Sequence, residues 1–244
     1  MQQKLFGVAV GAALLLSFGT GTALATASQD LEIVAGTDII LYAGGTATCT
    51  SGGSVVLCST FGEGTLGNSL DATSFDGWNV SVTATSNSPN CSGLAGPGCL
   101  STDNIDTVDV SSADALDVYF GDTSFSPELG LQVTETGSGV TGTAGAMGYA
   151  FTGPLGFSST AAPTLSGKIG TSLSLTAPGI VTTGGTPTSG PLSLAIEDTF
   201  ANGAGHTYDV DTTITAVPEP ASMVLFGSML LAITGIAKKK FGRR

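Results

Sequence analysis

The chain has 244 residues, of which 41% are hydrophobic and only 11% are charged, and its formal net charge is −12. Six of its seven basic residues lie near the two ends, so residues 26–217 carry one lysine, Lys168, against eighteen acidic residues, a formal charge of −17. A surface of this charge repels nucleic acid and anionic lipid, which argues against both as partners.

Residues 1–25 predict a secretory signal peptide. Lys4 provides a positive start, residues 5–18 form an apolar run, and Ala23-Leu24-Ala25 is a small-x-small cleavage site, with cleavage two residues later as a close alternative. An uncleaved signal anchor is the other interpretation, but the small residues after Phe18 favour cleavage. The mature chain is therefore expected outside the inner membrane.

Residues 26–216 are expected to form one extracytoplasmic domain. Gly, Ser and Thr are abundant there, whereas long polar helix formers are sparse. That composition favours β-strands joined by glycine-rich turns.

The clearest predicted strand is residues 78–85, where apolar and polar residues alternate strictly, so that Trp78, Val80 and Val82 face a core. Other predicted strands share this alternation or an apolar run between turn residues: 32–35, 39–42, 54–57, 105–110, 116–120, 129–133, 148–151, 173–175, 192–196 and 208–215. About ten short strands predict an all-β antiparallel β-sandwich. Residues 137–148 and 177–190 are expected to be loose.

The four cysteines form two close pairs, Cys49 with Cys58 and Cys91 with Cys99. An even number of cysteines in an exported chain predicts disulfides, and of the three possible connectivities the local pairs are favoured. A zinc site is the alternative, but export and the long spacings argue against it.

Motifs for catalysis or cofactor binding are weak. Residues 137–142 match G-x-G-x-x-G, but no convincing helix follows, as a phosphate site would require. His206 is the only histidine and lies in a turn-like segment without a nucleophile elbow nearby in sequence, so a surface loop residue is expected. A sugar hydrolase with paired carboxylates stays an open alternative, because it depends on the distance between two carboxyl groups in space, which the sequence does not give. We expect no enzyme activity and no cofactor.

An acidic cluster is the best remaining candidate for a metal site. It comprises Asp103, Asp106 and Asp109, followed by Asp114 and Asp117. Oxygen ligands of this kind suit calcium, but the spacing misses the EF-hand pattern, and on a strand Asp106 and Asp109 would face opposite sides. A solvated acidic surface is the expected role, with calcium binding as the alternative.

The C-terminal tail, residues 217–244, carries the most specific signal. Pro218-Glu219-Pro220 resists helix formation, residues 221–237 are uncharged and long enough for a short membrane helix, and residues 238–244 contain five basic residues. The basic end is expected to stay in the cytoplasm. A plain membrane anchor is the alternative interpretation.

This tail resembles the PEP-CTERM sorting signal of Gram-negative bacteria, a short domain that is also labelled as the C-terminal domain of ice-binding proteins. The resemblance rests on Pro218, Glu219 and Pro220, the apolar helix and the basic end. It implies that an exosortase, a membrane-embedded cysteine transpeptidase, cuts near the motif. The basic end is mostly Lys where the family often has Arg.

Together these observations predict an exported, non-enzymatic protein of the cell envelope or extracellular matrix. Signal peptidase and exosortase are its expected processing partners, the inner membrane holds it transiently, and the resemblance suggests association with exopolysaccharide or biofilm. A carbohydrate- or calcium-dependent adhesion module is the alternative, followed by a secreted hydrolase.

Overall fold

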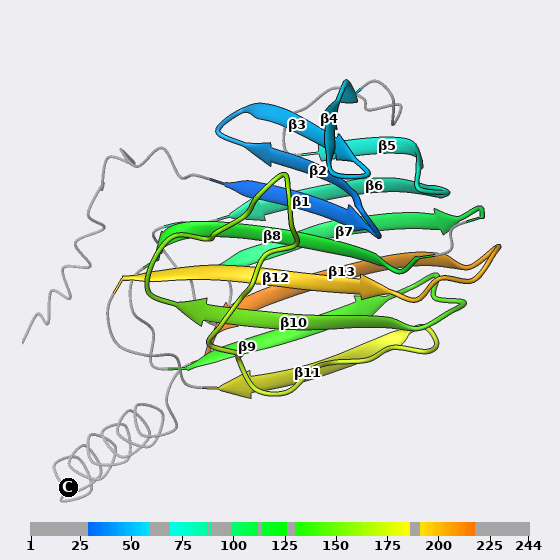
Figure 1. The fold of residues 1–244 in the computed structure, drawn as a ribbon. Helices are drawn as coiled ribbons and strands as arrows, with labels where there is room; N and C mark the ends of the chain where they lie inside the picture. Colours follow the sequence, from blue (N-terminus) through cyan, green and yellow to red (C-terminus); the bar gives the residue numbers. More distant parts are fainter. Residues whose placement is uncertain are drawn as a thin grey trace, which may run out of the picture.

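The computed structural model describes residues 29–58, 69–86, 88, 99–111, 114–125, 130–185 and 191–217. Figure 1 shows these residues as two layers of β-strands lying face to face. The predicted signal peptide and nearly all of the predicted sorting tail, including Pro218, Glu219 and Pro220, lie outside the described residues. Within those residues, no helix has the length and apolar character needed to cross a membrane.

Thirteen strands run through the described part of the chain. They are β1 (Asp30–Ala35), β2 (Asp38–Ala43), β3 (Thr46–Ser51), β4 (Ser54–Val56), β5 (Ser69–Phe75), β6 (Trp78–Ser86), β7 (Leu100–Asp109), β8 (Leu116–Phe125), β9 (Leu131–Gly137), β10 (Ala144–Phe151), β11 (Gly179–Gly185), β12 (Leu192–Phe200) and β13 (Thr207–Ala216).

The strands form two antiparallel sheets. The seven-stranded sheet has the order β10-β12-β8-β1-β2-β3-β4, and the six-stranded sheet has the order β11-β9-β13-β7-β6-β5. Sequence neighbours such as β1 and β2 pair as hairpins, whereas β8 joins β1 to β12 from a distant part of the chain. The predicted all-β, antiparallel, sandwich-like architecture is confirmed for these residues.

Alternating side chains build the core between the sheets. On β6, Trp78, Val80 and Val82 are 0%, 3% and 0% exposed, as the sequence predicts. The facing sheet contributes Leu194 and Ile196 from β12, both fully buried. Period-two alternation in an antiparallel strand buries one face, and here the two buried faces meet.

The structure corrects several details of the sequence prediction. The described residues contain thirteen strands where about ten were predicted, because β3, β5 and β11 were not expected as strands. β11 (Gly179–Gly185) lies within a stretch that was expected to be loose and pairs with β9, and β10 begins at Ala144 inside residues 137–148, the other such stretch. Residues 173–175 are not a strand; their apolar side chains belong to a segment that pairs only locally with β10.

One predicted disulfide is confirmed. Cys49 on β3 is bonded to Cys58 just beyond β4, with a Cα–Cα distance of 5.1 Å. Cys99 also takes part in a disulfide and is fully buried. Its predicted partner, Cys91, lies outside the described residues, so that pairing stays a prediction.

Candidate functional site

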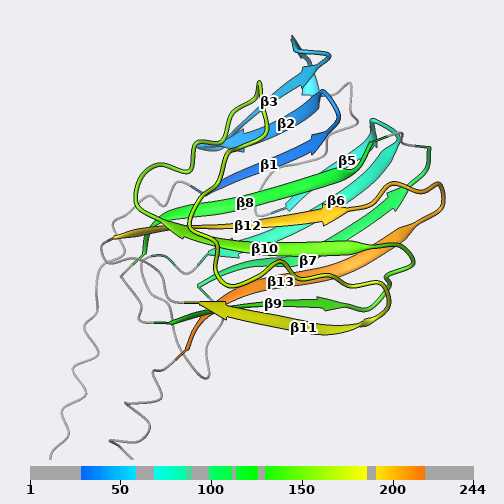
Figure 2. The same ribbon diagram turned by 60° about the horizontal axis from the view of Figure 1, so that its bottom comes forward.

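The connection between β10 and β11 crosses the outer face of the seven-stranded sheet (Figures 1 and 2). Leu155, Phe157 and Leu165 of this connection pack against apolar side chains of that face. The sheet makes room with Gly121 on β8, where an added Cβ would lie 2.6 Å from a methyl group of Leu155. The connection therefore shields part of the outer face from solvent.

The second half of this connection, residues 167–175, runs along the outer strand β10. Backbone hydrogen bonds join it there, including Ala150 N to Gly167 O at 2.8 Å and Ile169 N to Gly148 O at 2.8 Å. Ile169 is 2% exposed and packs into the core between the sheets. Its neighbour Lys168 is exposed and lies on the other side of the segment.

Two glycines shape this segment. Gly167 and Gly170 have φ angles of +74° and +72°. An added Cβ would lie 2.2 Å from the carbonyl oxygen of Ala150 at Gly167, and 2.2 Å from the hydroxyl of Thr183 at Gly170. Both positions therefore require glycine for its backbone conformation and for the close approach.

Glu197 on β12 is held in place by two tyrosines on the outer face. The Tyr119 hydroxyl on β8 donates to one carboxylate oxygen at 3.3 Å, and the Tyr149 hydroxyl on β10 donates to the other. Burial, reinforced by the neighbouring carboxylates, raises the pKa of both phenols, which keeps them protonated as donors. Asp117 lies nearby, and burial, followed by the charge of Glu197, raises the pKa of Asp117 to about 6.

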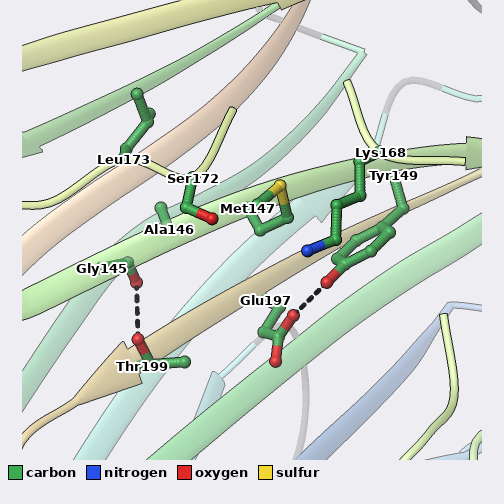
Figure 3. A pocket seen from close by; sticks show the side chains of 9 residues that line it. All are labelled: Gly145, Ala146, Met147, Tyr149, Lys168, Ser172, Leu173, Glu197 and Thr199. Carbon is green, nitrogen blue, oxygen red and sulfur yellow. Dashed lines mark hydrogen bonds between the residues drawn. The ribbon is translucent and has the colours of Figure 1, made fainter. Parts of the chain in front are cut away.

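A cavity of about 280 Å³ opens beside this cluster (Figure 3). It lies between β10, β12 and the segment around Lys168. The residues that line it are Gly145, Ala146, Met147, Tyr149, Lys168, Ser172, Leu173, Glu197 and Thr199. A carboxylate, an ammonium group and several hydroxyls thus meet at one place, which makes this cavity the candidate functional site.

Glu32 on β1 lies further along the same outer face and is fully buried. One of its oxygens accepts a hydrogen bond from the backbone N–H of Ser158 at 3.0 Å, and the other has no hydrogen-bond partner. Burial raises the pKa of Glu32 to about 7, although the Ser158 hydrogen bond acts in the opposite direction. Glu32 therefore helps to fasten the covering connection to the sheet.

A second pair of carboxyl groups is buried in the core between the sheets. Asp198 of β12 accepts hydrogen bonds from Thr212 at 2.6 Å and from Thr102 at 3.1 Å. Glu135 of β9 is fully buried, and neither of its side-chain oxygens has a hydrogen-bond partner. Burial is the main cause that raises the pKa of Asp198 to about 7 and of Glu135 to about 8, and the charge of Asp198 adds to the second shift. No substrate reaches this pair without opening the core.

Asp106, Asp109 and Asp117 of the predicted acidic cluster do not converge on one point. Asp106 is exposed on β7, while Asp109 on the same strand is buried and accepts from Gly203 N at 2.5 Å, so the two face opposite sides as expected. Asp117 lies on β8 in the other sheet. Within the described ranges, no group of three or more His, Cys, Asp or Glu side chains is arranged to hold a metal ion.

The remaining sequence candidates have structural roles. His206 is half-buried rather than a free surface residue, and its Nδ1 lies 3.3 Å from the Tyr208 hydroxyl. The G-x-G-x-x-G match at residues 137–142 forms the turn between β9 and β10, so a strand follows it where a phosphate site needs a helix.

Sequence reasoning did not identify Tyr119, Tyr149 and Glu197 as a cluster. Alternation placed Tyr119 on a strand, but no local pattern shows that residues 119, 149 and 197 come from adjacent strands. The signal that was present is the isolation of Lys168 as the one basic residue of residues 26–217. Because Lys168 is the one basic residue in so acidic a segment, its isolation makes its position a candidate binding site.

Comparisons with known proteins do not place this chain in a family. A scan against models of protein families finds no match, and a search of curated proteins finds no similar protein.

Proposed function

We propose that this chain is an exported, non-enzymatic protein of the cell envelope or extracellular matrix, sorted through a C-terminal signal of the PEP-CTERM type. The observation that carries the proposal is the Cys49–Cys58 disulfide. Structural disulfides persist in oxidising compartments and are rare in the cytosol. This supports export, which the signal peptide at the N-terminus predicts, while the sorting tail is proposed from the sequence.

The polar clusters support a binding or structural role rather than catalysis. Two tyrosine hydroxyls hold the Glu197 carboxylate in place as an acceptor, which suits binding, and threonine hydroxyls hold Asp198. Glu135 and Asp198 are enclosed in the core. General acid–base catalysis needs a carboxyl group within reach of a substrate proton, which this enclosed pair lacks.

The tail provides the test of sorting. In a host with an exosortase, we expect the surface protein to lack residues 221–244. Replacing Pro218 and Pro220 with Ala lets the predicted helix extend outward, so these variants should keep the tail while still inserting into the membrane. Deleting residues 238–244 removes the cytoplasmic anchor and should let precursor pass uncut.

Intact mass of the surface fraction measures these outcomes, with Ser222→Ala in the apolar run as a matched control that should be processed normally. Wild-type surface protein with its C-terminus intact would overturn the sorting proposal. So would identical processing of the wild type and the Pro218→Ala/Pro220→Ala variant.

A further inference from the structure

The cavity beside Glu197 has the dimensions of a small ligand site. Its volume is about 280 Å³, just below the range of about 300–1,000 Å³ that is typical of ligand pockets. Strands β10 and β12 form its floor and the segment around Lys168 forms its wall (Figure 3). A cavity of this size suits one ring-sized unit rather than an extended chain.

The acceptor in the cavity is fixed before any ligand arrives. Tyr119 and Tyr149 each donate to a different oxygen of Glu197. A carboxylate has about four acceptor positions, so two hydrogen bonds leave others available. Because the side chain is already ordered by the two phenols, a ligand hydroxyl that donates to it incurs little further entropy cost.

The donors come from the wall and from the neighbouring strand. Lys168 is exposed and carries three N–H donors, and its amine lies on the side of the cavity where the Tyr149 hydroxyl meets Glu197 (Figure 3). Ser172 lines the same cavity with a hydroxyl that can donate and accept, and the Thr199 hydroxyl, which donates to the Gly145 carbonyl oxygen at 3.4 Å, keeps its acceptor positions for a ligand (Figure 3). The backbone of residues 167–169 is held to β10, so the Lys168 backbone is fixed although its side chain is exposed.

The charge of the domain decides the class of ligand. Residues 26–217 carry a formal charge of −17, and Asp117 adds a carboxylate close to Glu197. A polyanion is repelled by this field, and a cation meets the ammonium group of Lys168. A neutral molecule with several adjacent hydroxyls avoids both penalties and uses the acceptor and the donors together.

We propose that this cavity binds a single neutral sugar unit of a glycan, with Glu197 accepting from its hydroxyls and Lys168, Thr199 and Ser172 hydrogen-bonding the others. The side chains of Tyr149 and Met147 add apolar contact for the C–H groups of the ring. The biological setting, an extracellular polysaccharide, rests on the proposed function, whereas the binding chemistry does not.

The test uses the full chain purified in detergent and an array of neutral, uronate-containing and sulfated glycans, followed by calorimetric titration of the neutral glycans that bind. Lys168→Met keeps an aliphatic stem and removes the donors from an exposed position, so it should fold normally. We expect it to weaken binding by about tenfold or more, because hydrogen bonds to charged groups are stronger than those between neutral groups. Thr199→Val should weaken binding as well, and Lys168→Arg should retain part of it.

Asp106→Asn, an exposed change on the other sheet, is the matched control and should bind like the wild type. Trp78 fluorescence verifies that each variant is folded. Binding of acidic glycans alone, binding unchanged in both Lys168→Met and Thr199→Val, or no glycan bound at millimolar concentration would each overturn the proposal. Export and tail processing are measured separately, so an exported protein that binds no sugar refutes only this inference. A protein that binds sugar but stays unprocessed refutes only the sorting proposal.

Discussion

Glu135 and Asp198 should make the stability of this protein fall as the pH rises. Burial, the main cause, raises the pKa of Glu135 from 4.5 to about 8, and the nearby Asp198 is raised from 3.8 to about 7. A raised pKa of an acid means that the folded state binds the proton more tightly than the unfolded chain does. The stabilisation is therefore complete below about pH 4 and is lost as the pH rises through about 7–8.

The size of the effect follows from the same values. One pKa unit corresponds to about 1.4 kcal/mol, so ionising Glu135 inside the folded protein costs at most on the order of 5 kcal/mol. No cation offsets this cost, because Lys168 is the only basic residue between positions 26 and 217 and lies on the outer face of a sheet. Asp198 of the facing sheet lies across the core from Glu135, and Thr212, which donates to Asp198, is the neighbour of Glu135 on the adjacent strand β13.

Glu135→Gln isolates this contribution. The amide has nearly the same shape but does not titrate, so the free energy of unfolding should fall less steeply with pH than in the wild type. Urea titrations between pH 5 and pH 9, followed by the fluorescence of Trp78, measure the slope, because this single tryptophan is 0% exposed. A constant offset from the buried amide leaves the slope unaffected.

Asp106→Asn is the control, since it removes one exposed charge without touching the core. Its pH dependence should match that of the wild type. If the wild-type and Glu135→Gln curves run parallel from pH 5 to pH 9, the buried pair is not protonated in the folded protein and the reasoning fails.

Two further predictions concern packing. Val80→Asp buries an unpaired charge at a position that is 3% exposed, so it should lower the free energy of unfolding by about 3–5 kcal/mol. Asn79→Asp, on the solvent face of the same strand, should change the free energy of unfolding little. If urea titrations show that both changes are tolerated equally, the orientation of β6 is wrong. Gly170→Ala should lower the free energy of unfolding by about 1–3 kcal/mol, because Gly170 has a positive φ and an added Cβ would lie 2.2 Å from Thr183. Gly179→Ala is the control and should have a small effect, since its Cβ would lie 3.8 Å from the nearest neighbours. An unchanged thermal unfolding of Gly170→Ala would contradict the required close approach.

Much of the fold follows from period-two alternation. The pattern of β6 predicts which side chains face the core, and the same pattern could have revealed the buried acids. Leu194 and Ile196 are followed two residues later by Asp198, and Leu131 and Val133 by Glu135, so each acid falls on an apolar face. Reading the alternation past the last apolar residue would have placed both acids in the core.

Other elements carry no such signal. β3 and β11 contain many Thr, Ser and Gly residues, and β11 has exposed or half-buried side chains throughout, so neither shows an apolar face. Their strand structure comes from backbone pairing with β2 and β9. The alternation of residues 173–175 wrongly predicted a strand, because Leu173 and Leu175 enter the core from a segment that lies beside the sheet.

The candidate site depends on long-range placement. Residues 149 and 197 become neighbours only because β10 pairs with β12, and Lys168 reaches them through a connection that crosses the sheet. Local sequence determines which residues are on a strand face, but it does not determine which strand lies next to which. The cavity could therefore be identified only from the structure.

The pairing of residues 167–175 with β10 also bears on how copies of this protein can meet. An unpaired outer strand offers a row of backbone donors and acceptors to any other strand, which is the usual start of intermolecular sheet growth. Here that row is partly occupied by hydrogen bonds from the chain itself. At high protein concentration the chain would thereby stay dispersed at this strand. Substitutions at Gly167 or Gly170 that release the segment should then appear first as concentration-dependent association, before any loss of the core.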